Sequence, residues 1–197
     1  MTMSKAAAET LPRPTQPPGD LAIWIFILAE LLVFAVFFLA YAWTRHANVE
    51  LFNEYQLTLD RRAGLINTLA LLTSSYCVVR AVAAVRLDRV RDCARWLVAA
   101  LALGGVFIVV KLAEYHHHFE QGIALSTNTF YMFYLSLTFF HFMHVVMGMV
   151  ILAAVAAKAW RGGYGAAEHA GVETGASYWH MVDLVWLILF PLVYVMN

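Results

Sequence analysis

The sequence has little charge and little cysteine, and it lacks several motifs that mark common enzymes. Asp, Glu, Lys and Arg make up only 13% of the 197 residues, and the formal net charge is zero. A chain without excess positive charge is not expected to bind nucleic acid. The two cysteines, Cys77 and Cys93, are too few for a disulfide framework or a zinc site. A Gly-rich phosphate loop, a nucleophile elbow and a Cys-x-x-Cys-His motif are absent. We therefore predict no catalytic and no metal-binding residue.

Apolar residues, by contrast, dominate the composition. They make up 62% of the chain, and the mean hydropathy is +0.68. Soluble domains are nearer half apolar and a quarter charged, so this composition indicates a membrane protein. Five apolar segments each reach the roughly 20 residues that a helix needs to cross a bilayer. They are Leu21–Trp43, Leu65–Leu87, Ala94–Ala113, Thr129–Lys158 and Tyr178–Met196. The sequence predicts an all-α, polytopic membrane protein, with one domain of five transmembrane helices over residues 20–197.

The N-terminal segment Met1–Gly19 is polar and rich in proline. Its basic tip is not followed by an apolar core and a cleavage site, so we expect no signal peptide. We predict a disordered tail over residues 1–19, with Gly19 and Asp20 capping the first helix. The polar turn Ser126–Thr129 is predicted to cap the fourth helix.

Positive residues are distributed unevenly between the two sides of the predicted protein. Such an asymmetry places the richer side in the cytoplasm. That side would carry Lys5, Arg13, Arg86, Arg89, Arg91, Arg95, Lys158 and Arg161, and the other side Arg45, Arg61, Arg62 and Lys111. The N-terminus is therefore predicted to be cytoplasmic and the C-terminus to lie outside.

Glu30 is the first ionisable residue inside a predicted span. A charged carboxylate facing lipid would cost about 2.5 kcal/mol or more, so Glu30 is expected to be protonated, paired or turned toward protein or water. It could serve a proton relay, or it could form a structural hydrogen bond to a neighbouring helix or subunit. The second interpretation is favoured.

His141 and His144 are three residues apart and share one helical face. One haem cannot take both axial ligands from this spacing, because the ligands approach opposite faces of the ring. A metal could use the pair with Glu30 or Asp183, but no Glu-x-x-His or His-Glu-x-x-His signature is present. We favour interhelical hydrogen bonding by neutral imidazoles.

Two further polar groups lie in or near predicted spans. His180 and Asp183 are one turn apart, and pairing with each other or with the His141 face is expected. Lys111 and Glu114 lie near a predicted helix end, where a lysine can extend its ammonium to the membrane surface. The consecutive residues His116–His118 cannot all face one ion, so we expect a wet interfacial turn there.

The order of these motifs resembles the cytochrome c oxidase subunit III family, the subunit III of haem-copper oxidases, over nearly all of the chain after the tail. The stretch FILAELLVFAVFFLAYAW is similar to the family helix whose buried glutamate falls on Glu30. NTLALLTSSYCVVRA resembles the next helix, and LGGVFIVVKLAEY places a family glutamate on Glu114. STNTFYMFYLSLTFFHFMHVVMG places two family histidines on His141 and His144. YWHMVDLVWLILF, with Glu173 before it, resembles the last family helix.

This resemblance implies a non-catalytic subunit in the bacterial inner membrane, with its C-terminus in the periplasm. Such a subunit carries no cofactor of its own apart from bound phospholipid. Its partner would be a haem-containing catalytic membrane subunit, whose assembly, stability or proton supply it supports. Lys158 falls where the family has an arginine beside a lipid phosphate, and Arg161 lies close by. A cation at the cytoplasmic membrane edge suits a phosphate.

The sequence departs from the family pattern in three places. Two N-terminal helices of the larger members are missing, Phe139 and Phe142 replace glycines, and Lys111 replaces a glutamine. The short entry into the first helix, PPGDLAIWIFIL, resembles the branch associated with nitric oxide reductase in denitrifying bacteria. We expect that branch first, and subunit III of an aerobic cytochrome c or quinol oxidase as the alternative.

Two other functions use the same polar residues. An independent proton channel or transporter could employ Glu30, His141, His144, His180 and Asp183. A di-haem cytochrome is disfavoured by the ligand geometry described above.

Overall fold

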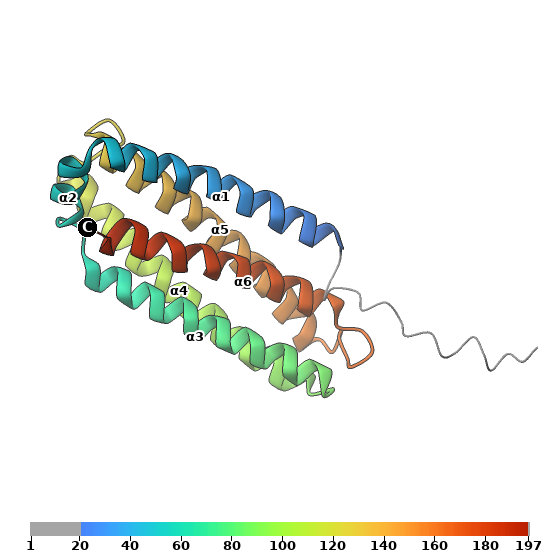
Figure 1. The fold of residues 1–197 in the computed structure, drawn as a ribbon. Helices are drawn as coiled ribbons and strands as arrows, with labels where there is room; N and C mark the ends of the chain where they lie inside the picture. The colour runs from blue at the N-terminus through green and yellow to red at the C-terminus, as the bar shows by residue number, and fades with distance from the viewer. Residues whose placement is uncertain (1–20, 197) are drawn as a thin grey trace, which may run out of the picture.

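The computed structural model describes residues 21–196, and these form an all-helical protein (Figure 1). Its elements are α1 (Leu21–Ala47), α2 (Val49–Gln56), α3 (Arg61–Arg86), α4 (Val90–Glu120), α5 (Thr129–Trp160), α6 (Ala170–Phe190) and the π-helical turn η2 (Pro191–Val195). Five of the helices are long and apolar enough to cross a membrane, which confirms the predicted fold class. The predictions on the tail and on the Gly19–Asp20 cap lie outside the described residues.

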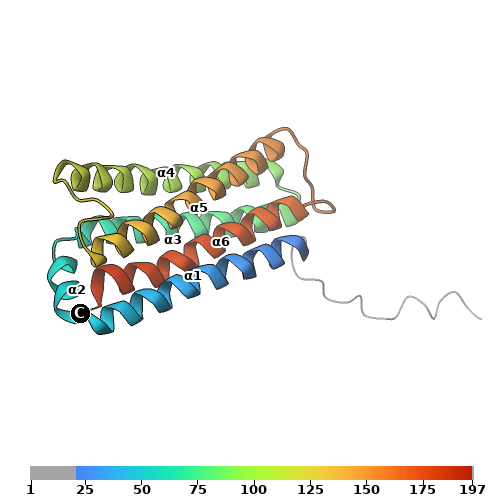
Figure 2. The same cartoon turned by 90° about the horizontal axis from the view of Figure 1, so that it is seen from above.

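Four of the long helices form a bundle. α3 packs on α4, α4 on α5, α5 on α6, and α6 returns to α3. α1 lies outside this ring, beside α6 (Figures 1 and 2). The fully buried indoles of Trp179 and Trp186, both on α6, fill the centre of the bundle. Trp179 fits there because Gly148 of α5 leaves room for its indole: a Cβ at Gly148 would lie 2.8 Å from Cε3 of Trp179.

α1 contributes a narrow stripe to the core. Its buried residues are Ile27, Phe34 and Tyr41, spaced seven apart. That spacing places all three on one face of a helix. The remaining surface of α1 is largely exposed apolar side chain, which suits contact with lipid or with another membrane subunit.

Several helices extend beyond the predicted spans, and the differences are largest at the end of α4 and the start of α6. α4 continues to Glu120 instead of ending at Ala113, so His116–His118 belong to a helix and the predicted interfacial turn is wrong. α6 begins at Ala170 instead of Tyr178. Hydropathy locates the hydrocarbon core, whereas the helices continue through the polar interface where charged residues are tolerated.

The short helix α2 was not anticipated. It lies across the end of the bundle where α1 ends and α3 begins (Figure 1). Phe52 of α2 is fully buried and contacts Tyr41 of α1 and Phe130 of α5 edge-on.

At the same end of the bundle, the Asn128 side chain accepts a hydrogen bond of 2.9 Å from the backbone N–H of Tyr131. This confirms the predicted polar cap of α5.

The positive residues gather at one end of the bundle, as the predicted charge asymmetry requires. The α3–α4 and α5–α6 connections lie at the end where α1 begins, and the C-terminal end lies opposite (Figure 1). Arg86, Arg89, Arg91, Lys158 and Arg161 therefore fall at one end of the molecule. The compartment that each end faces stays a prediction.

Candidate functional site

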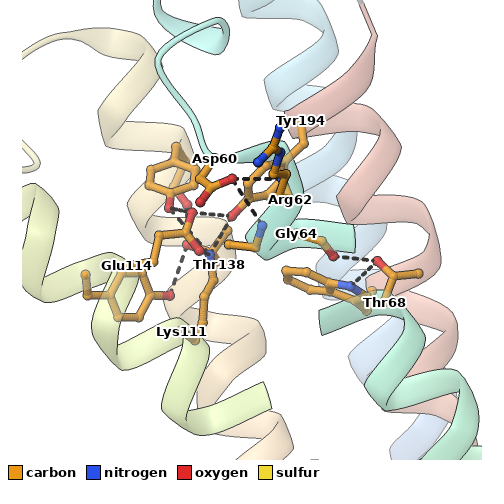
Figure 3. A network of polar contacts seen from close by, with 12 residues as sticks. Asp60, Arg62, Gly64, Thr68, Lys111, Glu114, Thr138 and Tyr194 are labelled. Carbon is orange, nitrogen blue, oxygen red and sulfur yellow. Dashed lines mark hydrogen bonds and ion pairs between the residues drawn. The ribbon is translucent and has the colours of Figure 1, made fainter. Parts of the chain in front are cut away.

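A buried ion pair forms the centre of the polar network inside the bundle (Figure 3). Lys111 and Glu114 of α4 lie three residues apart, and the Lys111 Nζ donates to Glu114 Oε2 at 3.0 Å. The side chain of Lys111 has no exposed surface, and that of Glu114 is 5% exposed. The prediction that Lys111 extends to the membrane surface is wrong, because α4 continues well beyond it and the ammonium finds its partners inside the bundle.

Two tyrosines from other elements complete this pair. Tyr134 of α5 and Tyr194 of η2 donate to Glu114 Oε1 at 2.6 and 2.8 Å. Lys111 Nζ donates to the Tyr194 hydroxyl at 2.6 Å and to that of Tyr134 at 3.4 Å. We call these four residues the Lys111 cluster. Both charges are fully hydrogen-bonded, which is the condition under which a buried ion pair is tolerated.

An aromatic shell surrounds the ammonium. The Nζ of Lys111 lies 5.1 Å from the ring centroid of Tyr115 and 5.7 Å from that of Trp186. Cation–π attraction supplements the hydrogen bonds in such an environment. The Tyr115 hydroxyl itself donates to Thr138 Oγ1 at 3.0 Å, which ties α4 to α5 (Figure 3).

Glu30 and His144 form a second interhelical pair. The Nε2 of His144 lies 3.0 Å from Glu30 Oε2, so the pair joins α1 to α5. The other ring nitrogen, Nδ1, lies 2.8 Å from the carbonyl oxygen of Phe140 and donates to it. With Nδ1 as a donor, the ring holds a fixed orientation toward Glu30. The Glu30 side chain is 21% exposed and the ring 9%, so the pair lies at the edge of the packed protein.

His141 differs from its neighbour. Neither of its ring nitrogens has a hydrogen-bond partner among the described residues, although the residue is fully buried. Its ring lies 5.2 Å from that of Trp186 in a stacked arrangement and 5.6 Å from that of Phe107 edge-on. The predicted interhelical hydrogen bonding therefore holds for His144 and is wrong for His141, which packs as an aromatic ring.

A serine stands between the two polar residues of α6. The Nδ1 of His180 lies 2.6 Å from Ser75 Oγ of α3. Ser75 and His180 are also the polar neighbours of Asp183. His180 and Asp183 form no direct hydrogen bond among the described residues, and Ser75 of α3, to which the sequence argument assigned no role, lies beside both. Ser74, beside it, donates to the carbonyl oxygen of Ala100 at 2.9 Å.

Two ionic contacts organise the opposite end of the bundle. Arg86 donates to Glu173 Oε1 at 2.7 Å, and His169 lies 3.3 Å from the same oxygen. Asp88, with φ of 60°, accepts a hydrogen bond of 3.0 Å from the backbone N–H of Ala166. These contacts hold the α3–α4 connection against the loop that precedes α6.

The predicted lipid-binding cations lie at this end too. The Nζ of Lys158 is 4.5 Å from the ring centroid of Tyr164, and Arg161 is exposed just after α5. Burial raises the pKa of the Tyr164 phenol, with the neighbouring Cys93 and Glu168 adding to the shift, so this ring stays neutral at physiological pH.

Arg80 is a charged residue that the sequence argument overlooked. It lies within α3, is exposed, and donates through Nη1 to the Tyr76 hydroxyl at 3.0 Å. Its guanidinium lies 5.2 Å from the ring centroid of Trp96. A charge inside an apolar helix is itself the signal that could have drawn attention to it.

The described residues offer no group of three or more His, Cys, Asp or Glu side chains that could hold a metal ion. The site is therefore a set of interhelical polar contacts in which Lys111 and Glu114 satisfy each other.

Comparison with known proteins identifies the family. The family model described as cytochrome c oxidase subunit III matches residues 18–197. The chain belongs to the cytochrome c oxidase subunit III family. It is 33% identical to cytochrome c oxidase subunit 3 of Thermostichus vulcanus, over 90% of this chain and 87% of that protein. It is 28% identical to quinol oxidase subunit 3 of Bacillus subtilis, over 90% and 86%.

A further subunit III relative widens the range of oxidases. Cytochrome bo(3) ubiquinol oxidase subunit 3 of Pseudomonas aeruginosa is 25% identical over 88% of this chain and 83% of that protein. These subunit III proteins are matched over most of their own length. The short entry into the first helix, which suggested the nitric oxide reductase branch, therefore does not separate that branch from oxidase subunits of similar length.

Proposed function

We propose that the protein is the non-catalytic subunit III of an aerobic terminal oxidase that uses cytochrome c or quinol. It binds a haem-containing catalytic membrane subunit and supports that subunit's assembly, stability or proton supply. The observation that carries the proposal is the match, over nearly the full length of both chains, to oxidase subunits of two electron-donor classes. The hydrogen bonding of the Lys111 cluster supports a structural role, because both charged groups find their partners within the cluster.

The test is purification of the tagged chain from native membranes in a mild detergent, followed by an optical spectrum and mass spectrometry. Co-purified haem and copper with oxidase chains would support the proposal. Haem b and haem c with nitric oxide reductase chains would replace it with the branch expected from the segment PPGDLAIWIFIL. A colourless protein without partners would refute both, and would bring the channel or transporter hypothesis forward.

The location of Glu30 supports a role in that complex. The Glu30–His144 pair joins the peripheral α1 to the bundle and retains some exposure, so a catalytic subunit packed beside α1 could reach it. A proton relay would require turnover of the complex to change when Glu30 can no longer ionise.

We also propose that phospholipid binds near Lys158 and Arg161. Both cations lie at the end of α5, beside the exposed indole of Trp160. Cations and tryptophan at a helix end favour a phosphate headgroup. Native mass spectrometry of the purified protein should show bound lipid, and Lys158→Ala with Arg161→Ala should reduce the lipid retained.

The proposed orientation places the α3–α4 connection in the cytoplasm of a bacterial inner membrane and the α2 end in the periplasm. The charge asymmetry between the two ends supports it. Both native cysteines are buried, so they give little background in labelling. A membrane-impermeant thiol reagent applied to intact spheroplasts should modify Leu57→Cys and spare Arg89→Cys.

A further inference from the structure

Arg80 lies at a depth where a charge facing lipid is unfavourable. α3 is bounded by Arg61 and Arg62 at one end and by Arg86 at the other, so its centre falls near the middle of the membrane. At about 1.5 Å per residue, Arg80 lies about 10 Å from that centre. Half of the hydrocarbon core is about 15 Å. The Cα of Arg80 is thus inside the apolar layer, although the side chain is exposed on the surface of the bundle.

The guanidinium does not turn toward the nearer membrane surface. A long cationic side chain alone in lipid extends toward the closest interface, which for Arg80 lies at the Arg86 end of α3. Its hydrogen bond goes instead to Tyr76, one turn earlier and closer to the membrane centre. Trp96 of α4 flanks the guanidinium at 5.2 Å. Arg80 is held in place at depth by two aromatic side chains.

The charge of Arg80 is not neutralised by this chain. Among residues 21–196, no carboxylate forms an ion pair with it, whereas Arg86, Arg95 and Lys111 all have such partners. Arginine presents five N–H donors, and the described contacts of Arg80 use one of them, on the Tyr76 hydroxyl. The remaining donors have no hydrogen-bond partner among residues 21–196, and an exposed planar guanidinium is suited to two-point binding of a carboxylate.

We propose that the α3 face around Arg80 docks onto a transmembrane helix of another subunit, which supplies an Asp or Glu at matching depth. The face consists of Leu72, Tyr76, Val79 and Arg80, with Trp96 of α4 beside it, and its large apolar members are about half exposed. Charge complementarity selects this occupant, because a phosphate lies outside the apolar layer and the guanidinium points away from it. The inference rests on the proposed function, since it requires a multisubunit complex.

The first experiment maps the neighbour of this face in the assembled complex. A photoreactive p-benzoylphenylalanine is placed at Val79, and in a control at Val150 of α5, which is 65% exposed. Val150 lies past the centre of its helix toward the same end, so its depth matches. Irradiation of native membranes should join Val79 to a transmembrane segment of another subunit that contains an acidic residue. Adducts with phospholipid alone at Val79 would overturn the inference and assign Arg80 to a lipid.

The second experiment measures how much the charge of Arg80 contributes to binding of the other subunit. Arg80→Leu should leave the amount of membrane-inserted chain unchanged. The haem that co-purifies with it should fall roughly tenfold or more, as expected when one member of a buried interfacial ion pair is removed. Arg89→Leu removes an equal charge outside the membrane and should retain wild-type haem. Arg80→Glu combined with the reciprocal acid-to-arginine change in the crosslinked partner should restore it.

The docking face and the proposed function can be refuted separately. If the wild-type chain co-purifies with haem and Arg80→Leu retains as much, the docking face is refuted and the proposed function stands. If the wild-type chain captures no haem-containing subunit at all, the proposed function itself is refuted.

Discussion

The ammonium of Lys111 lies 3.0 Å from the carboxylate of Glu114, and both side chains are buried in the bundle. The two residues are on one helix, and Tyr134 and Tyr194 bring a second helix and the C-terminal turn to them. The cluster thereby ties α4, α5 and η2 together in the interior. Its energetic behaviour is open to direct measurement, because each charge can be removed alone or together with its partner.

Single substitutions in the Lys111 cluster are expected to be much more harmful than the double substitution. Lys111→Met leaves the Glu114 carboxylate buried without a counter-charge, and Glu114→Gln does the same to the ammonium. Each should destabilise the protein by about 3–5 kcal/mol, whereas Lys111→Met with Glu114→Gln should stay near wild type. Unfolding in mixed micelles of increasing dodecyl sulfate gives the three values. Additive single effects would show that the two residues do not act as a pair.

Glu30→Gln keeps the size of the side chain and removes its ionisation. We expect normal membrane insertion, because the substitution removes a group that can ionise. We also expect a changed stability or turnover of the catalytic partner. Glu54→Gln, at an exposed position of α2, is the control and should have no effect. Oxygen consumption by purified complex, measured with and without a proton gradient, is the readout. Wild-type turnover and stability in Glu30→Gln complexes would show that the carboxylate is only a packing residue.

His180 depends on Ser75 for its hydrogen bond, so Ser75→Ala should loosen the contact between α3 and α6. Hydrogen bonds between membrane helices contribute about 0.6 kcal/mol, with a maximum near 1.7. His180→Ala and Asp183→Ala should cost a similar amount or somewhat more. Thr73→Ala serves as the control, because Thr73 is exposed and bonds only to Leu69 of its own helix. Equal stabilities of Ser75→Ala and Thr73→Ala would contradict this account of α6.

Alanine substitutions at two glycines distinguish an effect on packing from an effect on helix propensity. A Cβ at Gly148 would lie 2.8 Å from the ring of the fully buried Trp179, so Gly148→Ala should destabilise the bundle by about 1–3 kcal/mol. Gly105 has nothing within 4 Å of such a Cβ. Gly105→Ala should therefore be neutral or stabilising, by up to about 1 kcal/mol. Thermal denaturation of both variants in detergent, monitored by circular dichroism, tests the difference.

The sequence was sufficient to predict the five spans and the Asn128 cap, because both depend on local composition. It also drew attention to Glu30 and His144, which turned out to contact each other across two helices. Lys111 was misplaced because a span drawn from hydropathy ended at Ala113, which made an interior residue look terminal. The length of an apolar run does not reveal where its helix ends.

The tyrosines of the Lys111 cluster could not be recognised in the sequence. Tyr134 and Tyr194 resemble ordinary aromatic residues of membrane helices, and only the packing of α5 and η2 against α4 brings their hydroxyls to Glu114. Ser75 was overlooked for the same reason, since its importance comes from His180 on a distant helix. Arg80 was visible in the sequence, but its outward direction follows only from the arrangement of the bundle.

The placement of Lys111 and Glu114 on the same helix has a consequence for biosynthesis. The ribosome delivers α4 to the membrane before Tyr134, 20 residues after Glu114, and long before Tyr194, 80 residues after it. During that interval the two opposite charges, one turn apart, can neutralise each other within α4 itself. The helix thus enters lipid as a nearly neutral dipole, and the tyrosines join it only as the later helices arrive.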